Sequence, residues 1–265
     1  MDFKTKLENT VNKNNSLLCI GLDPEIPKIP SALRKKSQPI FSFNKSIIDS
    51  THDLVCAYKP NIAFYEAYGL NGLKQLKLTI DYLKKNYPDI PIILDAKRAD
   101  IGNTAKMYAR AVFEYWNVDA ATVYPQYGLD SLLPFFAYPE KCTILIIKTS
   151  NPDSGMFYDL KVNDQPFYLR VAKEIAKWKR NNLGLFVGAT YPGELKNIRY
   201  LFPNTPILTA GIGAQGAKTT EAVLSGIDKN KQGLICNASR AIIYDKSVRA
   251  KARQTRDIIN QARYG

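Results

Sequence analysis

The chain has 265 residues, of which 45% are hydrophobic, and a formal net charge of +13. No apolar run approaches the roughly 20 residues that a membrane-spanning helix needs, and the polar stretch 1–15 is unlike a secretory signal, so the sequence predicts a cytoplasmic protein. The positive charge is scattered over pairs such as Lys84-Lys85. Because RNA-recognition, zinc-finger and aromatic–basic patterns are absent from the sequence, solvated helix faces explain this charge better than nucleic-acid binding does.

Short apolar runs alternate with helix-length segments along the whole chain. A helix is predicted over Phe3–Val11, before the first strand, and another over Val248–Ala262. The predicted strands are Leu17–Leu22, Val55–Ile62, Ile92–Asp95, Ala120–Tyr124, Thr143–Lys148, Leu185–Ala189, Ile207–Ala210 and Leu234–Asn237. The predicted helices between them include Phe41–Asp53, Leu70–Asn86, Thr104–Trp116, Pro166–Asn181 and Thr219–Gly226. Continuous apolar runs of this kind are typical of parallel strands that are covered on both faces.

Strand–helix units repeated in this way predict an α/β fold, a (β/α)8 TIM barrel formed by residues 1–265 as a single domain, with an N-terminal helix before the first strand. A doubly wound open sheet is the structural alternative, although it does not need eight regularly spaced units. The irregular segment Ser150–Asp164 follows the fifth predicted strand. It either helps to cover a site at the barrel mouth or is a surface excursion.

Cysteine and histidine usage argues against a metal centre. Cys19, Cys56, Cys142 and Cys236 are far apart and form no Cys-x-x-Cys pair, which predicts reduced, structural thiols. His52 is the single histidine, so a cluster of histidine ligands is impossible. Any general acid or base must therefore come from Lys, Asp, Glu or Tyr.

The third predicted strand ends in a dense cluster of charge that begins at Asp95 and extends to Asp100. Asp95 and Lys97 are two positions apart and should share one face of the strand. Opposite charges at the end of an apolar strand are costly unless they are paired, so we expect a functional site here. Polar residues also follow other strands, and in a barrel they would meet at the same rim: Asp23, Lys59, Ser150 and Arg240.

A glycine-rich turn, Gly211–Gly216, follows the seventh predicted strand and matches the G-x-G-x-x-G pattern. The dinucleotide fingerprint belongs to the opening unit of a Rossmann domain, so its late position argues against NAD binding. Barrels often hold phosphate after strands seven and eight, on backbone N–H groups. Arg240 would add a charge-assisted contact to such a phosphate.

The segment Asp95–Thr104 resembles the D-x-K-x-x-D-I-x-x-T signature of the orotidine 5′-phosphate decarboxylase family. Ala210, directly before the glycine-rich turn Gly211–Gly216, departs from the family, since many members have proline at that position. Further motifs of the family occur in the same order: Gly21–Pro24, Tyr58–Asn61, Thr149–Pro152, Gly211–Gly216 and Asn237–Arg240. Of these, Thr149–Pro152 and Asn237–Arg240 resemble the group of shorter bacterial-type enzymes.

The resemblance implies decarboxylation of orotidine 5′-monophosphate to uridine 5′-monophosphate (UMP) and CO2, the last step of de novo pyrimidine synthesis, without a metal or other cofactor. Lys97 would stabilise the carbanion at C6 electrostatically and then protonate it. Asp95 would lie near the substrate carboxylate, and Lys59 would orient Asp95 and the ribose. Whether Asp95 also repels that carboxylate stays open.

The same resemblance implies the residues that bind the substrate. Asp23 would bind ribose hydroxyls and Ser150 the pyrimidine edge. The remaining substrate-binding residues would lie at and near the phosphate: Gly213, Gln215, Ser239 and Arg240.

The resemblance also implies a homodimer, because the last acid of the signature enters the neighbouring subunit's pocket in this family. The catalytic residue Asp100 and the substrate-binding residues Ile101 and Thr104 would thus complete the partner's site.

Two other functions compete with this prediction. A 3-keto-L-gulonate 6-phosphate decarboxylase shares the Asp-x-Lys-x-x-Asp pattern but uses Mg²⁺ held by extra acids, where this chain has Lys59 and Thr149-Ser150. Chelator sensitivity would separate the two enzymes. A nucleic-acid-binding barrel would leave the acids at the rim unexplained, since they would repel phosphodiesters.

Overall fold

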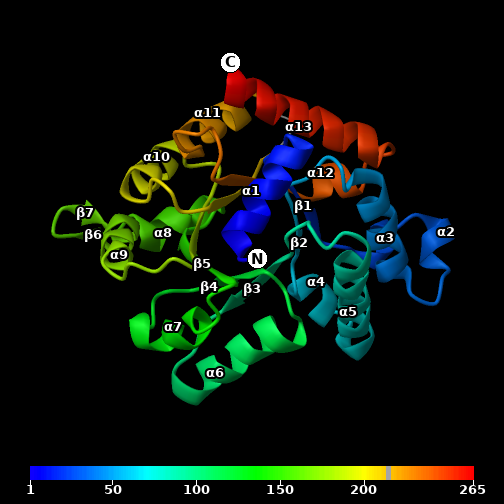
Figure 1. The fold of residues 1–265 in the computed structure, drawn as a ribbon, viewed down its shortest axis with the longest axis horizontal. Coiled ribbons are helices and arrows are strands. Elements are labelled where there is room, and N and C mark those ends of the chain that lie inside the picture. The colour runs from blue at the N-terminus through cyan, green and yellow to red at the C-terminus, as the bar shows by residue number, and fades with distance from the viewer. Residues whose placement is uncertain (213–215) are drawn as a thin grey trace.

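The computed structural model describes residues 1–212 and 216–265, with backbone only for 216 and 217. Within these residues, eight parallel strands form one sheet in the order β2-β1-β10-β9-β8-β5-β4-β3. Isolated bridges from Tyr58 to Ile92 and from Asn61 to Asp95 join the two ends of that order, so the sheet closes into a barrel (Figure 1). The strands are β1 (Leu18–Leu22), β2 (Ala57–Pro60), β3 (Ile93–Arg98), β4 (Ala120–Val123), β5 (Cys142–Lys148), β8 (Leu183–Val187), β9 (Ile207–Ala210) and β10 (Leu234–Ala238). The predicted barrel is confirmed.

Helices surround the barrel (Figure 1). The longer ones are α3 (Pro39–Thr51), α5 (Gly69–Asn86), α6 (Gly102–Arg110), α7 (Leu129–Phe136), α9 (Phe167–Ala176), α10 (Pro192–Leu201), α11 (Gly216–Gly226) and α13 (Val248–Tyr264). One-turn helices are α2 (Ser31–Arg34), α4 (Ala63–Glu66), α8 (Gly155–Tyr158) and α12 (Arg240–Ile243). The helices α7 and α10 are not among those named from the sequence, and the predicted helix Thr104–Trp116 is in fact α6 followed by the π-helical turn η2 (Ala111–Tyr115).

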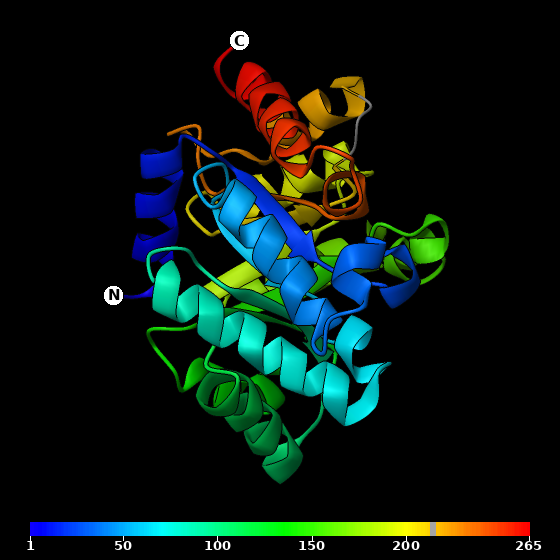
Figure 2. The same ribbon diagram turned by 90° about the vertical axis from the view of Figure 1, so that its right-hand side faces the viewer.

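The predicted N-terminal helix is α1 (Phe3–Asn14), which lies across one end of the barrel (Figure 2). The Asp2 carboxylate caps it by accepting a hydrogen bond from the Thr5 amide at 3.0 Å. Lys6 Nζ lies 3.0 Å from Asp119 Oδ1, and Asp119 Oδ2 accepts the Ile92 amide at 2.8 Å. Because Asp119 and Ile92 immediately precede β4 and β3, this network fixes α1 to the amino-terminal end of the barrel.

The strands are buried almost throughout, which explains their continuous apolar sequence. All five residues of β1 and all four of β4 are buried. The four cysteines are buried and free of disulfides. Among the described residues, no helix is both long and apolar enough to cross a membrane.

The segment after β5 lies at the opposite end of the barrel from α1 (Figure 2). It contains the 3-10 turn η3 (Pro152–Ser154), α8, and a two-stranded antiparallel hairpin of β6 (Lys161–Val162) and β7 (Gln165–Pro166). The predicted irregular segment therefore has short elements of its own at the end where the strands finish.

Candidate active site

Asp95 is the centre of the charged cluster at the carboxyl end of β3. Its Oδ2 lies 2.9 Å from Lys59 Nζ, and its Oδ1 lies 2.7 Å from Lys97 Nζ. Thr122, on the neighbouring strand β4, donates its hydroxyl hydrogen to Asp95 Oδ1 at 2.8 Å. One buried carboxylate thus holds two lysine side chains, one from β2 and one from β3.

The electrostatics of this cluster follow from burial and pairing. Burial alone would raise the pKa of Asp95, but the ammonium groups of Lys59 and Lys97 outweigh it and hold that pKa well below its usual range. Burial alone would lower the pKa of Lys59, whereas its attraction to Asp95 and Asp23 raises that pKa above its usual value. The cluster is therefore charged at neutral pH, with Asp95 ionised and Lys59 protonated.

Lys97 adopts an unusual backbone conformation. Its φ is 46°, in the left-handed region that is unfavourable by on the order of 1–2 kcal/mol for a residue with a side chain. The pairing between β3 and β4 also shifts register between Leu94 and Arg98, so β3 bulges at Lys97. Strained backbone conformations of this kind cluster at functional sites, where the surrounding structure holds them in place.

Thr122 supports this bulge, although it is not among the site residues predicted from the sequence. Its hydroxyl oxygen accepts the Lys97 amide at 3.0 Å while it donates to Asp95. The hydroxyl thereby fixes both the backbone of the bulge and the carboxylate that pairs with Lys97. The side chain of Lys97 is 42% exposed, compared with 4% for Lys59, so Lys97 alone of the two reaches the open mouth.

A second polar cluster lies beside the first, where β1 and β10 end. Asp23 is buried, and burial raises its pKa although Lys59 and a hydrogen bond with Ser239 act in the opposite direction. A Cβ on Gly21 would lie 1.8 Å from Ser239 Oγ, so only glycine permits this approach of the two strand ends. Within the described residues, Asp23 Oδ1 and Asn237 Oδ1 are buried acceptors without a hydrogen-bond partner. Such atoms suit a ligand that brings hydroxyl donors.

The remaining predicted binding residues surround the mouth. Ser150 is half-buried, two positions beyond the end of β5. Arg240 is exposed at the start of α12, just beyond β10. Gly213 and Gln215 lie outside the described residues, but the turn that leads to them leaves β9 through Gly211, whose φ is +100°. Because β5, β9 and β10 are parallel, their carboxyl ends place the described groups at the same end of the barrel.

Asp100, Ile101 and Thr104 are not among the hydrogen-bond partners of the Asp95 cluster. Asp100 is half-buried and accepts the Ile101 amide at 2.8 Å, while Ile101 and Thr104 are exposed around the start of α6.

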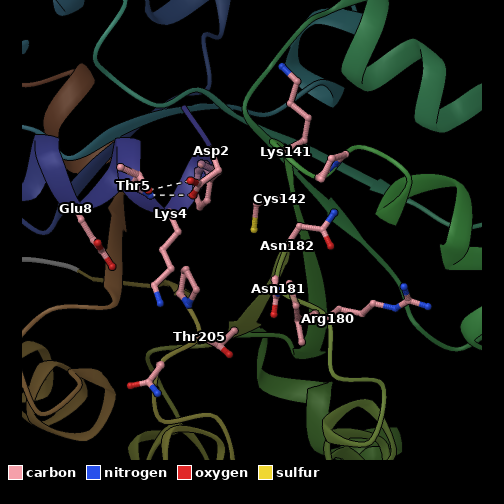
Figure 3. Close-up of a pocket in the computed structure, with 15 residues that line it drawn as sticks. Asp2, Lys4, Thr5, Glu8, Lys141, Cys142, Arg180, Asn181, Asn182 and Thr205 are labelled. Carbon is pink, nitrogen blue, oxygen red and sulfur yellow. Dashed lines mark hydrogen bonds between the residues drawn. The ribbon is translucent and has the colours of Figure 1, made fainter.

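Two other kinds of site, a metal-binding cluster and the cavity shown in Figure 3, can be compared with the Asp95 cluster. Among the described residues there is no group of three or more His, Cys, Asp or Glu side chains that could hold a metal. A cavity of about 580 Å³ lies beside α1, where Cys142 begins β5 at the amino-terminal end of the barrel. Its cations Lys4, Lys141 and Arg180 extend in different directions (Figure 3), so they form no common anion site.

A parallel barrel whose strands end in paired lysines and carboxylates belongs to the class of barrel enzymes that act at the carboxyl-terminal face. The sequence model of the family described as "Orotidine 5′-phosphate decarboxylase / HUMPS" matches residues 16–255. The chain belongs to this family.

Individual relatives agree with this assignment. The curated orotidine 5′-phosphate decarboxylase of Cellvibrio japonicus is 46% identical, with 99% of this chain and 100% of that protein covered. That of Flavobacterium johnsoniae is 47% identical over 90% of this chain and 88% of its own length. The solved structure of Leishmania donovani OMP decarboxylase superposes with a TM-score of 0.89 and 35% identity, covering all of both chains. The bacterial relatives support the predicted bacterial-type group.

Proposed function

We propose that this chain converts orotidine 5′-monophosphate to UMP and CO2, as the names of its relatives state for those proteins. The observation that carries this proposal is the Lys59–Asp95–Lys97 network, with one exposed ammonium at the mouth of the barrel. The family model covers more than one activity in its description, whereas the closely similar curated proteins are named orotidine 5′-phosphate decarboxylases.

The chemistry requires a cation beside C6 of the pyrimidine. When the bond from C6 to the carboxylate breaks, CO2 leaves and the electron pair remains on C6 in an orbital that the ring cannot delocalise. The Lys97 ammonium stabilises this pair and then transfers a proton to C6. Because Asp95 and Thr122 hold the lysine in place beforehand, little reorganisation is needed during the reaction.

The surrounding groups position the nucleotide for this step. Asp23, with its unpartnered buried oxygen, binds ribose hydroxyls, and Ser239 orients Asp23. Ser150 binds the pyrimidine edge. Arg240, together with Gly213 and Gln215, holds the phosphate, whose binding energy contributes to the reaction at the distant ring.

An absorbance assay that follows loss of orotidine 5′-monophosphate tests this function directly. The purified chain is expected to consume the substrate, form UMP in equal amount, and keep its rate after treatment with EDTA. A rate that falls with EDTA and returns with Mg²⁺ would favour the competing sugar-phosphate decarboxylase. Absence of UMP under all conditions would refute the proposal.

The active unit in this proposal is a homodimer. Large apolar side chains are exposed directly before α6, on α6, on η2 and on α7: Ile101, Met107, Tyr115 and Leu133. Exposed apolar residues that gather in one region mark association surfaces. Asp100, Ile101 and Thr104 lie around the start of α6, so a partner docked there would receive them near its own Lys97.

Complementation between two inactive variants tests this shared site. In a symmetric dimer, a heterodimer of Lys97→Ala and Asp100→Ala has one site with both native residues and one site with neither. Subunits mixed and reassorted at equal amounts should recover about a quarter of the wild-type activity. If the mixture stays as inactive as its components while heterodimers form, Asp100 does not act across the interface.

A further inference from the structure

Lys148 is a buried cation that the proposed reaction does not use. It is the last residue of β5, and its side chain is 0% exposed. Its Nζ lies 2.6 Å from Asp159 Oδ1 and 2.8 Å from Glu194 Oε1. The ring of Tyr191 lies 4.1 Å from the ammonium and adds a cation–π contact. A buried ammonium with two carboxylates and an aromatic face is fully saturated by its neighbours.

The partners of Lys148 belong to two separate parts of the barrel mouth. Asp159 follows α8 in the segment 149–164, whereas Glu194 lies in the first turn of α10, beyond β8. The ammonium therefore ties the segment after β5 to the helix after β8. A second set of bonds runs in parallel, since Ser154 donates to the Tyr191 hydroxyl at 2.9 Å and that hydroxyl donates to the Asn151 carbonyl at 3.3 Å.

The same region fixes Ser150, two residues beyond Lys148. The Gly188 amide donates to the Lys148 carbonyl at 3.0 Å. A Cβ on Gly188 would lie 2.7 Å from Ser150 Cα, so Ser150 packs against the backbone directly after β8. Thr190 Oγ1 lies 3.4 Å from the Ser150 carbonyl oxygen. Movement of the Lys148 anchor would therefore displace Ser150.

We propose that Lys148 is a positioning residue that holds Ser150 and the segment 149–164 over the pyrimidine through its ion pairs with Asp159 and Glu194. The inference rests on the proposed decarboxylase function. Loss of the anchor frees the segment and weakens nucleotide binding, while the Asp95–Lys97 pair on β3 stays intact. The effect thus falls on KM and on UMP affinity rather than on the pH profile of kcat.

The test compares Lys148→Met and Asp159→Asn with the matched control Lys177→Met. Lys177 pairs with Glu174 within one exposed helical stretch. The Lys177→Met variant therefore removes a lysine ion pair that lies away from the mouth. Asp159 is partly exposed, so its conservative replacement keeps the proposal testable if Lys148→Met does not fold. The readouts are KM and kcat with orotidine 5′-monophosphate, UMP affinity by calorimetry, and the rate of chymotrypsin cleavage after Phe157, identified by mass spectrometry.

Both mouth variants should raise KM and weaken UMP binding by about tenfold, and cleavage after Phe157 should accelerate by at least about tenfold because local opening becomes easier. Lys177→Met should match the wild type in all three. Unchanged KM and UMP affinity in both mouth variants overturns the proposal, whether or not cleavage accelerates. A wild-type chain that is inactive but binds UMP refutes the decarboxylase function instead. In that case UMP affinity and the cleavage rate still show whether Lys148 anchors the segment 149–164.

Discussion

Two lysines lie at irregular ends of barrel strands, and their surroundings differ. Lys97 is the penultimate residue of β3, where the register with β4 shifts, and Lys148 is the last residue of β5, where the register with β8 shifts. Lys97 is 42% exposed and shares its one carboxylate with Lys59, whereas Lys148 is 0% exposed and has two carboxylates of its own. A cation that stabilises a passing charge needs an open side and incomplete pairing. A cation that holds two segments together needs neither.

The largest expected effect comes from Lys97→Ala. Loss of the ammonium removes both the electrostatic stabilisation and the proton donor, so kcat should fall at least about 10⁴-fold. UMP affinity and the thermal midpoint should change little, because the side chain is not part of the core. Steady-state kinetics, calorimetry and thermal melting measure these three quantities. Lys148→Met should instead lower UMP affinity and leave kcat less affected. Equal kcat losses in the two variants would show that the two lysines do not differ in role.

Asp95→Asn should damage both chemistry and stability. The substitution leaves Lys59 buried without its carboxylate, and removing one partner of a buried pair costs about 3–5 kcal/mol of unfolding free energy. Lys97 also loses its anchor, so kcat should fall by about 10³-fold. Urea denaturation and the decarboxylation assay measure the two losses. An Asp95→Asn protein as stable as the wild type would show that the Lys59–Asp95 pair does not hold the site together.

Arg240→Ala should separate binding from chemistry at the other side of the mouth. Charge-assisted hydrogen bonds contribute about 1.5–3 kcal/mol, so UMP affinity should fall by about 10- to 100-fold. At saturating substrate, kcat should fall less than UMP affinity does, because Arg240 acts on the phosphate and is not a hydrogen-bond partner of Asp95. Calorimetry with UMP checks this, and uridine serves as the control ligand because it lacks the phosphate. Equal losses for UMP and uridine would argue against a phosphate contact.

Thr122→Val should have a smaller and more selective effect. It keeps the shape of the side chain but removes the hydroxyl that accepts the Lys97 amide and donates to Asp95. We expect kcat to fall by about tenfold, which corresponds to about 1.4 kcal/mol of activation free energy, with KM nearly unchanged. Thr122→Ser should restore most of the rate. If serine is no better than valine, the methyl group rather than the hydroxyl supports the bulge.

Acid unfolding should show the smallest effect. The pKa of Asp95 is lower in the folded chain than its ordinary value near 4. Its ionisation therefore stabilises the fold fully above that pH, and this stabilisation is lost progressively as the pH falls below about 4. The stability difference between wild type and Asp95→Asn, measured by urea unfolding, should shrink over this acid range. A constant difference would show that the charge of Asp95 contributes nothing.

The sequence predicted the barrel and the charged cluster well, because continuous apolar runs and charges at strand ends are local signals. It did not predict the bulge at Lys97. A regular strand already places Asp95 and Lys97 on one face, so nothing in the sequence called for an irregular backbone there. Thr122 was missed because a threonine inside an apolar strand carries no pattern of its own. The role of Lys148 depends on Asp159 and Glu194, which are distant in the chain and meet the lysine only after folding.

A crystal structure with UMP bound would show directly whether Lys97 is the group beside C6. We expect the Lys97 ammonium to lie within about 3.5 Å of C6, a distance suited to proton transfer, while it still contacts Asp95. We also expect Lys148 to stay buried and distant from the nucleotide. A Lys97 amine that points to solvent, or UMP bound away from Asp95, would contradict the account.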